Sequence, residues 1–178
     1  MYGAGIGCQF GVDAGGERTT FVINPRAEIL DIYRSTPDTL RALAGGLPDN
    51  MARRGGEGEE AWSVLEIVCH LRDAEERAMD RVRLMRDEPR PALPAYDQAA
   101  LARERRYREQ PLADALAAFV RLRAEHVALL EDLAPAAWDR TGLHEEHGEI
   151  SISQLTLHMA AHDAIHLAQI ARRLAPRK

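Results

Sequence analysis

The chain has 178 residues, of which 46% are hydrophobic and 29% charged, and its formal net charge is −5. This length and balance are typical of one soluble globular domain with a sizeable core. The negative charge argues against nucleic acid as a general partner. No apolar run reaches the roughly 20 residues of a membrane helix, and no signal peptide is recognisable. We therefore expect a cytoplasmic protein whose two cysteines, Cys8 and Cys69, stay reduced.

The first 23 residues are rich in glycine and poor in apolar side chains. Their glycine spacing resembles a phosphate-binding loop only superficially, because no Lys-Ser/Thr pair ends it and no clear strand or helix flanks it. We predict a Gly-rich tail over residues 1–23 and a single domain over residues 24–175.

Two long helices are predicted in the first half of this domain. Asn24 followed by Pro25 is typical of a helix start, and Gly45 of a helix end, with Pro37 as a potential kink between them. The second helix starts at a capping box, Ser63-Val64-Leu65-Glu66, and is expected to run to residue 87.

Two more long helices are predicted in the second half. Residues 89–94 indicate a rigid connector, after which Asp97 can cap a short helix that extends to about Gln110. Pro111 then permits a third long helix up to residue 133, and a second capping box, Ser151-Ile152-Ser153-Gln154, starts the fourth.

No segment shows sustained period-two alternation of β-branched residues, so we predict an all-α fold. The polar segments 48–60 and 136–149 are expected to be loops. The expected architecture is a four-helix antiparallel bundle. It has a long connection between the second and third long helices, which could cross over, and a short extra helix within that connection.

Three histidines, His158, His162 and His166, stand four residues apart on the last predicted helix. Residues at i and i+4 share a helix face, so any two neighbours of the three can reach one ion. A pair such as His162 and His166 plus one histidine from a facing helix leaves positions open for water or substrate, as expected of a catalytic divalent site. Gln169, almost one turn beyond His166, could orient a ligand.

Spacing alone leaves the third ligand undecided among His70, His126 and His144. Glu66 and Asp73 lie one helical turn on either side of His70. No general base is fixed by the sequence, and Glu66, Asp73 and His144 are the catalytic candidates.

Several segments together resemble the DinB/YfiT-like superfamily of metalloenzymes. Two histidine-containing segments carry most of the resemblance: Trp62-Ser63-Val64-Leu65-Glu66 followed by Cys69-His70-Leu71, and His162-Asp163-Ala164-Ile165-His166-Leu167-Ala168-Gln169-Ile170. The segments between them fit the same pattern: Pro94-Ala95-Tyr96-Asp97, Phe119-Val120-Arg121-Leu122-Arg123, and Leu143-His144 ahead of Gly148-Glu149-Ile150-Ser151. It covers roughly residues 25–174.

The resemblance implies a four-helix bundle of the DinB type with a divalent metal held by His70, His162 and His166. It removes His126 and His158 from this ligand set. Members of the superfamily are implicated as S-transferases of low-molecular-weight thiols (bacillithiol, mycothiol), as maleylpyruvate isomerases or as hydrolases, and many have no assigned reaction. Homodimers are common among them, so a homodimer is expected here.

The first functional hypothesis is therefore a metal-dependent S-transferase of a small thiol that acts on a small-molecule substrate in stress or detoxification. Zinc, nickel or iron in an open three-histidine site would favour the thiolate, which is the nucleophilic form. The alternatives are a hydrolase of small amides or esters and a stress-linked metal-binding protein without turnover. A fourth protein ligand, His144 or His158, would favour the last of these because it would close the site.

Other residues that could carry chemistry are given structural roles. The arginines between residues 103 and 108 alternate with glutamates, which is typical of a solvated helix face rather than a nucleic-acid site. Cys69 is expected to be a buried packing residue. Trp62 and Trp138 are expected in the core or at a helix start.

Overall fold

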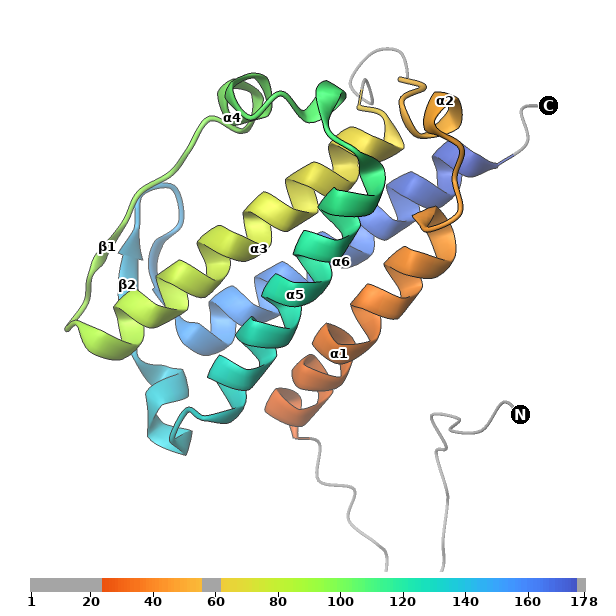
Figure 1. The fold of residues 1–178 in the computed structure, drawn as a ribbon. Coiled ribbons are helices and arrows are strands. Elements are labelled where there is room, and N and C mark those ends of the chain that lie inside the picture. The colour runs from red at the N-terminus through yellow and green to blue at the C-terminus, as the bar shows by residue number, and fades with distance from the viewer. Residues whose placement is uncertain (1–23, 56–61, 176–178) are drawn as a thin grey trace, which may run out of the picture.

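The computed structural model describes residues 24–55 and 62–175. Its four long helices form a bundle (Figure 1). They are α1 (Pro25–Ala44), α3 (Val64–Asp87), α5 (Leu112–Glu131) and α6 (Ile152–Leu174). Helices α1 and α3 each pack against both α5 and α6, which closes the bundle around a common core. The predicted four-helix bundle is confirmed, while the Gly-rich segment over residues 1–23 lies outside the described residues.

The long connection between α3 and α5 returns along the outside of the bundle, so these two neighbouring helices run in the same direction (Figure 1). It contains the strand β1 (Ala92–Leu93), the helix α4 (Gln98–Glu104) and the 3₁₀ helix η2 (Tyr107–Glu109). The predicted crossover and short extra helix are thus present, although the bundle is not antiparallel throughout. The extra helix ends at Glu104 instead of about Gln110, since Arg106 adopts a left-handed conformation with φ of 47°.

Both predicted capping boxes are present. The N–H of Glu66 donates to the Ser63 hydroxyl at 3.3 Å, while the Glu66 carboxylate accepts the Ser63 N–H at 2.9 Å. Ser151 and Gln154 repeat the pattern at 3.1 and 2.8 Å. These boxes set where α3 and α6 begin, and therefore which side chains face the bundle interior on each helix.

Helix α1 continues through Pro37. A proline inside a helix lacks the N–H that would bond to the carbonyl four residues earlier. In this protein that carbonyl belongs to Tyr33, and the buried guanidinium of Arg123 donates to it at 3.5 Å. A side chain from α5 thus occupies the hydrogen-bond acceptor that Pro37 leaves free.

A small three-stranded sheet was not predicted. Strands β2 (Thr141–His144) and β3 (Gly148–Ser151) form an antiparallel hairpin, and β1 pairs in parallel with β2. The loop predicted over residues 136–149 was therefore wrong in part, and the 3₁₀ helix η3 (Pro135–Asp139) also falls largely within it. The loop predicted over residues 48–60 contains the short helix α2 (Asp49–Ala52), and its residues 56–60 lie outside the described part of the chain. Elements of two to five residues are too short to show a period, but this sheet ties the crossover connection to the hairpin beside α6.

The core fills the space between the four long helices. Cys69 is buried within it, and burial raises the pKa of its thiol to about 12, consistent with a packing role. Trp138 is also buried, and Trp62 is half-buried at the start of α3. None of the helices in the described part of the chain is long and apolar enough to cross a bilayer.

Candidate metal centre

Three histidines from two helices meet inside the bundle. His70 lies on the second turn of α3, while His162 and His166 lie one turn apart on α6. The Nε2 atoms of His70 and His162 are 2.9 Å apart, and one nitrogen from each of the three rings lies within 4.8 Å of the other two. We call His70, His162 and His166 the histidine triad.

The spacing of these nitrogens suits a single divalent cation. Two imidazole nitrogens, each about 2.0–2.1 Å from a shared ion, stand roughly 2.9–3.4 Å apart, and the His70 to His162 separation falls at the short end of this range. His70 is only 2% exposed. Two nitrogens that face each other at this depth with no carboxylate between them could both bind one cation.

Neighbouring groups define which nitrogen of each α6 histidine is free. Nδ1 of His166 contacts Oε1 of Gln169 at 2.9 Å, which requires the ring proton on Nδ1 and leaves Nε2 as the acceptor. Nδ1 of His162 and Oδ1 of Asp163 are both buried without a hydrogen-bond partner and lie 3.6 Å apart. A cation on Nε2 of His162 requires the proton on Nδ1, where the Asp163 carboxylate can accept it.

The surroundings of His70 and His166 favour the neutral form of their rings, which is the form that binds metals. Burial, followed by the proximity of His162 and His166, lowers the pKa of His70 to about 3. Burial and His162 also lower the pKa of His166. At neutral pH these rings therefore need no deprotonation before they bind a cation.

One face of the triad is covered by an aromatic side chain. The Trp62 ring lies 4.9 Å from the His70 ring, measured between centroids. The sequence predicted Trp62 in the core or at a helix start and did not predict its contact with a histidine eight residues later, because that contact depends on the bend of the chain into α3. The indole excludes water from this side of His70.

A second buried cluster lies beside the triad, and sequence reasoning missed it. Arg123 on α5 is 1% exposed and donates to both carboxylate oxygens of Glu75 at 2.8 and 2.7 Å and to Asp163 at 2.6 Å. His126, one of the open third-ligand candidates, contacts Glu75 at 2.9 Å. We call Arg123, Glu75, Asp163 and His126 the arginine network.

The one available signal for the arginine network was the position of Arg123 in its helix. It lies four residues after the buried Phe119 and seven before the buried Leu130, so it occupies the apolar face of α5. A charged residue on such a face needs a buried partner of opposite charge.

The two carboxylates named as catalytic candidates are occupied by other groups. Glu66 accepts hydrogen bonds from Ser63 and from Arg108 at 2.8 Å; burial raises its pKa, but these bonds outweigh burial and lower it overall. Asp73 accepts from Tyr107 at 2.6 Å and from Arg72 and Arg105. Within the described residues, neither contributes an oxygen to the close group of ligand atoms around the triad.

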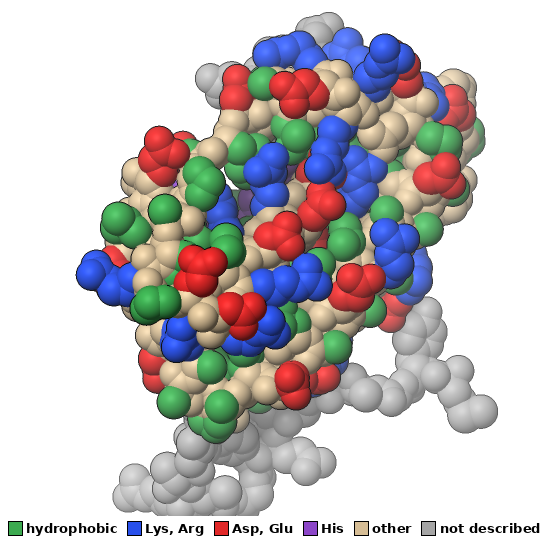
Figure 2. Space-filling model, turned by 60° about the vertical axis from the view of Figure 1, so that its left-hand side comes forward, with side chains coloured by type: hydrophobic (Ala, Val, Ile, Leu, Met, Phe, Trp, Pro, Cys, Tyr) green, Lys and Arg blue, Asp and Glu red, His purple; other side chains and the backbone are tan. Residues whose placement is uncertain are grey.

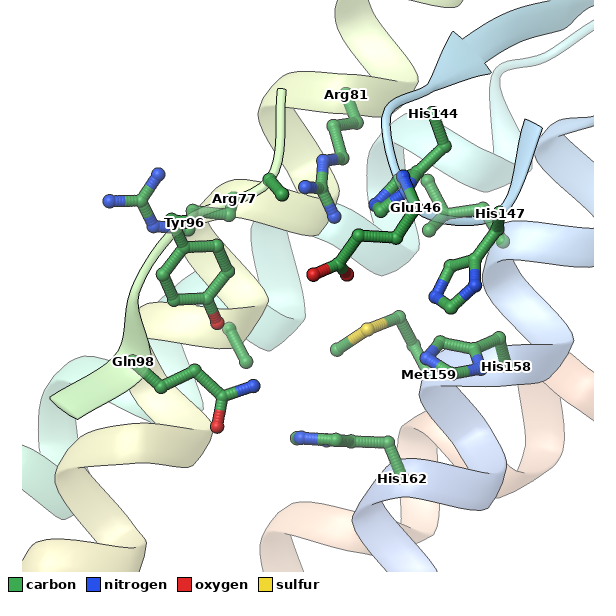
Figure 3. A pocket seen from close by; sticks show the side chains of 13 residues that line it. Arg77, Arg81, Tyr96, Gln98, His144, Glu146, His147, His158, Met159 and His162 are labelled. Atoms are coloured by element: carbon green, nitrogen blue, oxygen red, sulfur yellow. The ribbon is translucent and has the colours of Figure 1, made fainter. Parts of the chain in front are cut away.

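The remaining histidine candidates line a pocket next to the triad (Figure 3). His144, His147 and His158 face this pocket together with His162. The rings of His144 and His147 are stacked with centroids 4.6 Å apart, and burial lowers the pKa values of His144 and His158. In the described part of the chain, neither His144 nor His158 joins the triad as a fourth close ligand atom.

The four-helix bundle and the partly buried triad place the protein among helical-bundle proteins with a histidine cluster that could hold a divalent cation. A profile of the DinB superfamily matches residues 32–170, and the chain belongs to this superfamily.

Two relatives bear on function. The chain is 33% identical over 156 residues to a protein of Oceanobacillus iheyensis, across 87% of each chain. It is 30% identical over 148 residues to a protein of Geobacillus thermodenitrificans, across 80% of each chain. Both relatives are named as presumed metal-dependent hydrolases.

A solved structure shares the fold. YfiT from Bacillus subtilis, described as a probable metal-dependent hydrolase with an unusual four-helix bundle topology, matches with a TM-score of 0.77 at 21% identity. The match covers 88% of this chain and 90% of YfiT. At this identity the likeness shows a common fold.

Proposed function

We propose that the protein is a metal-dependent hydrolase of a small amide or ester, with its divalent cation held by His70, His162 and His166. The observation that carries the proposal is the convergence of three imidazoles, one buried and two half-buried. The Nε2 atoms of His70 and His162 are 2.9 Å apart, and no carboxylate in the described residues joins the group. The names of the relatives from Oceanobacillus and Geobacillus support hydrolysis as the reaction.

A cation bound by three protein nitrogens keeps open positions and supplies Lewis-acid chemistry, which activates water and polarises a carbonyl. The chain itself orients the donors: Gln169 holds the ring of His166, and Asp163 faces the ring of His162. Trp62 keeps water away from His70. In the adjoining pocket, the lowered pKa values leave His144 and His158 neutral, so either can accept a proton at neutral pH.

Metal content tests the ligand set. Protein purified without an affinity tag or added metal should contain one zinc, nickel or iron ion per chain by elemental analysis. His162→Ala and His166→Ala should each lose it on dialysis. His158→Ala, on the same helix but outside the triad, should retain it. Stoichiometric metal in both triad variants would refute the assignment.

The reaction is tested on the metal-loaded protein with a panel of small esters and amides. Hydrolysis should disappear in His166→Ala and persist in a matched exposed variant such as Arg83→Gln.

The family resemblance favoured transfer of a small thiol, and an open position on the cation can take a thiolate as readily as water. Assays with bacillithiol, mycothiol and glutathione separate the two reactions: thiol adducts without hydrolysis would replace the hydrolase proposal with the transferase.

A further inference from the structure

Two arginines on one face of α3 form no ion pair in the described part of the chain, although the charge of Glu146 acts on Arg81 from a longer distance. Arg77 and Arg81 lie one turn apart and are half-buried, and no ion pair within the described residues involves either of them. Arg81 donates one hydrogen bond, to the carbonyl of Pro94 at 2.7 Å, which leaves its other N–H groups free. Arg77 stacks on the ring of Tyr96 at 4.1 Å, and its Nε is buried without a hydrogen-bond partner.

Neighbouring arginines on the same chain behave differently. Arg72 pairs with Asp73 at 2.7 Å, and Arg83 pairs with Asp80 at 3.1 Å. Holding two unneutralised guanidinium groups one turn apart costs free energy, because their charges repel and burial removes water. In line with this, burial and the charge of Arg77 lower the pKa of Arg81 below its ordinary value.

Both arginines line the pocket that reaches the histidine triad (Figure 3). This cavity of about 140 Å³ is bounded by Arg77, Arg81 and Tyr96 on one side and by His158 and His162 on the other. Figure 3 shows the guanidinium of Arg81 directed toward the cavity from α3, whereas that of Arg77 lies against Tyr96 at the outer side of the cavity. In Figure 2 a hollow on this face has histidine at its floor and Lys or Arg side chains at its rim.

We propose that Arg81 forms an oxyanion subsite, with Arg77 beside it at the outer side of the cavity, so that the substrate carries a carboxylate or phosphate group that Arg81 holds directly while its reacting group reaches the cation at His162. This deepens the proposed function and rests on it. The small cavity, well below the roughly 300–1,000 Å³ of sites for drug-sized ligands, has room for one charged end group. Guanidinium groups match the planar, bidentate geometry of both oxyanions.

The same pocket contains one negative group, and it sharpens the proposal. Glu146, at the tip of the β2–β3 hairpin, points its carboxylate into the cavity (Figure 3). It forms no ion pair with either arginine in the described structure, so it lies beyond 4.0 Å from both. An anion in the subsite would meet two positive charges and this single negative one. Removal of the Glu146 charge should therefore strengthen anion binding.

The test is a calorimetric titration of the full chain at low ionic strength with inorganic phosphate and, separately, with acetate and malonate. The zinc-loaded protein is titrated first. The protein after chelation follows, since there no cation can hold the anion and the arginines are measured alone. The wild type should bind at least one of these anions saturably in both forms, and the tighter one identifies the charged group of the substrate.

The variants isolate the arginines. Arg81→Gln should weaken binding by roughly tenfold, the loss expected for a charge-assisted hydrogen bond, and Arg77→Gln should weaken it by less. Arg83→Gln, on the exposed side of the same helix, should leave binding unchanged. Glu146→Gln should tighten binding by about threefold. Because Arg77 and Arg81 are replaced separately, misfolding of one variant leaves the other as a test.

Three results would overturn the subsite. The first is no saturable binding by the wild type, and the second is wild-type affinity in both arginine variants. The third is weaker binding in Glu146→Gln: His144, Glu146 and His147 also lie close enough to hold one cation, and this result would mean that such a cation holds the anion. Zinc stoichiometry is measured on the same samples. Anion binding by a wild-type protein that takes up no zinc when zinc is supplied would refute the proposed function and keep the subsite, whereas zinc uptake and hydrolysis without anion binding would do the reverse.

Discussion

The histidine triad and the arginine network are two buried polar clusters that meet at consecutive residues of α6, His162 and Asp163. In the arginine network the positive charge of Arg123 is shared by two carboxylates, and both oxygens of Glu75 accept hydrogen bonds. In the triad, the Nε2 atoms of His70 and His162 face each other at 2.9 Å, and no carboxylate of the described residues joins the close group of ligand atoms. Buried groups that satisfy each other stabilise a fold, whereas buried groups that lack a shared partner point to a ligand from outside.

The largest effect should come from breaking the arginine network. Arg123→Met leaves Glu75 and Asp163 buried without their cation, so the free energy of unfolding should fall by about 3–5 kcal/mol, measured by urea denaturation. Arg121→Met is the matched control on the same helix, because Arg121 is exposed and lies 3.6 Å from the exposed Glu125. It should change stability by no more than about 0.5 kcal/mol. An Arg123 variant as stable as this control would contradict a structural role.

The pH dependence of stability should come next. Burial raises the pKa of Glu75, but the charge of Arg123 and the hydrogen bond of His126 outweigh it and lower the pKa from 4.5 to about 2. Because the folded value lies below the unfolded one, this carboxylate stabilises the fold at pH values above 4.5 and loses its contribution as the pH falls toward 2. Unfolding free energies at pH 5, 4 and 3 should therefore fall more steeply for the wild type than for Glu75→Gln. Equal slopes would rule out this linkage.

A smaller effect is expected where the two clusters meet. Asp163→Asn keeps the shape of the side chain but removes the charge that faces Nδ1 of His162 at 3.6 Å. Zinc affinity should fall by roughly 10- to 100-fold, the usual loss when the partner of a histidine ligand is replaced, as measured by competition with a chromophoric chelator. The exposed Asp132→Asn serves as the control. Unchanged affinity in Asp163→Asn would separate the network from the metal centre.

The smallest effect should follow loss of Gln169. Gln169→Ala removes the acceptor of the His166 Nδ1 proton, so zinc affinity should fall by about tenfold or less. Stability of the chelated protein should stay within about 0.5 kcal/mol, since Gln169 lies at the edge of the bundle and is half-buried. A large loss of stability with normal zinc affinity would place Gln169 in the fold rather than at the metal centre.

Local patterns in the sequence predicted the parts of this molecule that depend on neighbouring residues. The capping boxes at Ser63 and Ser151 each involve groups three residues apart, and both formed as predicted. The spacing of His162 and His166 likewise required only helix geometry. The third member of the triad, His70, lies 92 residues before His162, so spacing could not select it and the family resemblance did.

Features that depend on distant contacts were missed for a physical reason. A periodicity analysis treats Glu75 and Arg123 as interruptions of an apolar stripe, although their mutual contact over 48 residues lets both be buried. The sequence analysis did not single out Arg77 and Arg81, because only the placement of the hairpin turns their surroundings into a pocket. Strands of two to four residues left no alternation to detect.

The place of α6 after the other long helices in the chain decides when the triad can form during synthesis. α6 is the last of the described helices to leave the ribosome, it supplies two of the three histidines, and it packs against both α1 and α3. Until it emerges, the nascent chain exposes apolar helix faces that have no partner, a state prone to aggregation. Capture of the proposed cation would then be possible only for a chain translated through α6, so the ion would select chains that contain all four long helices of the bundle.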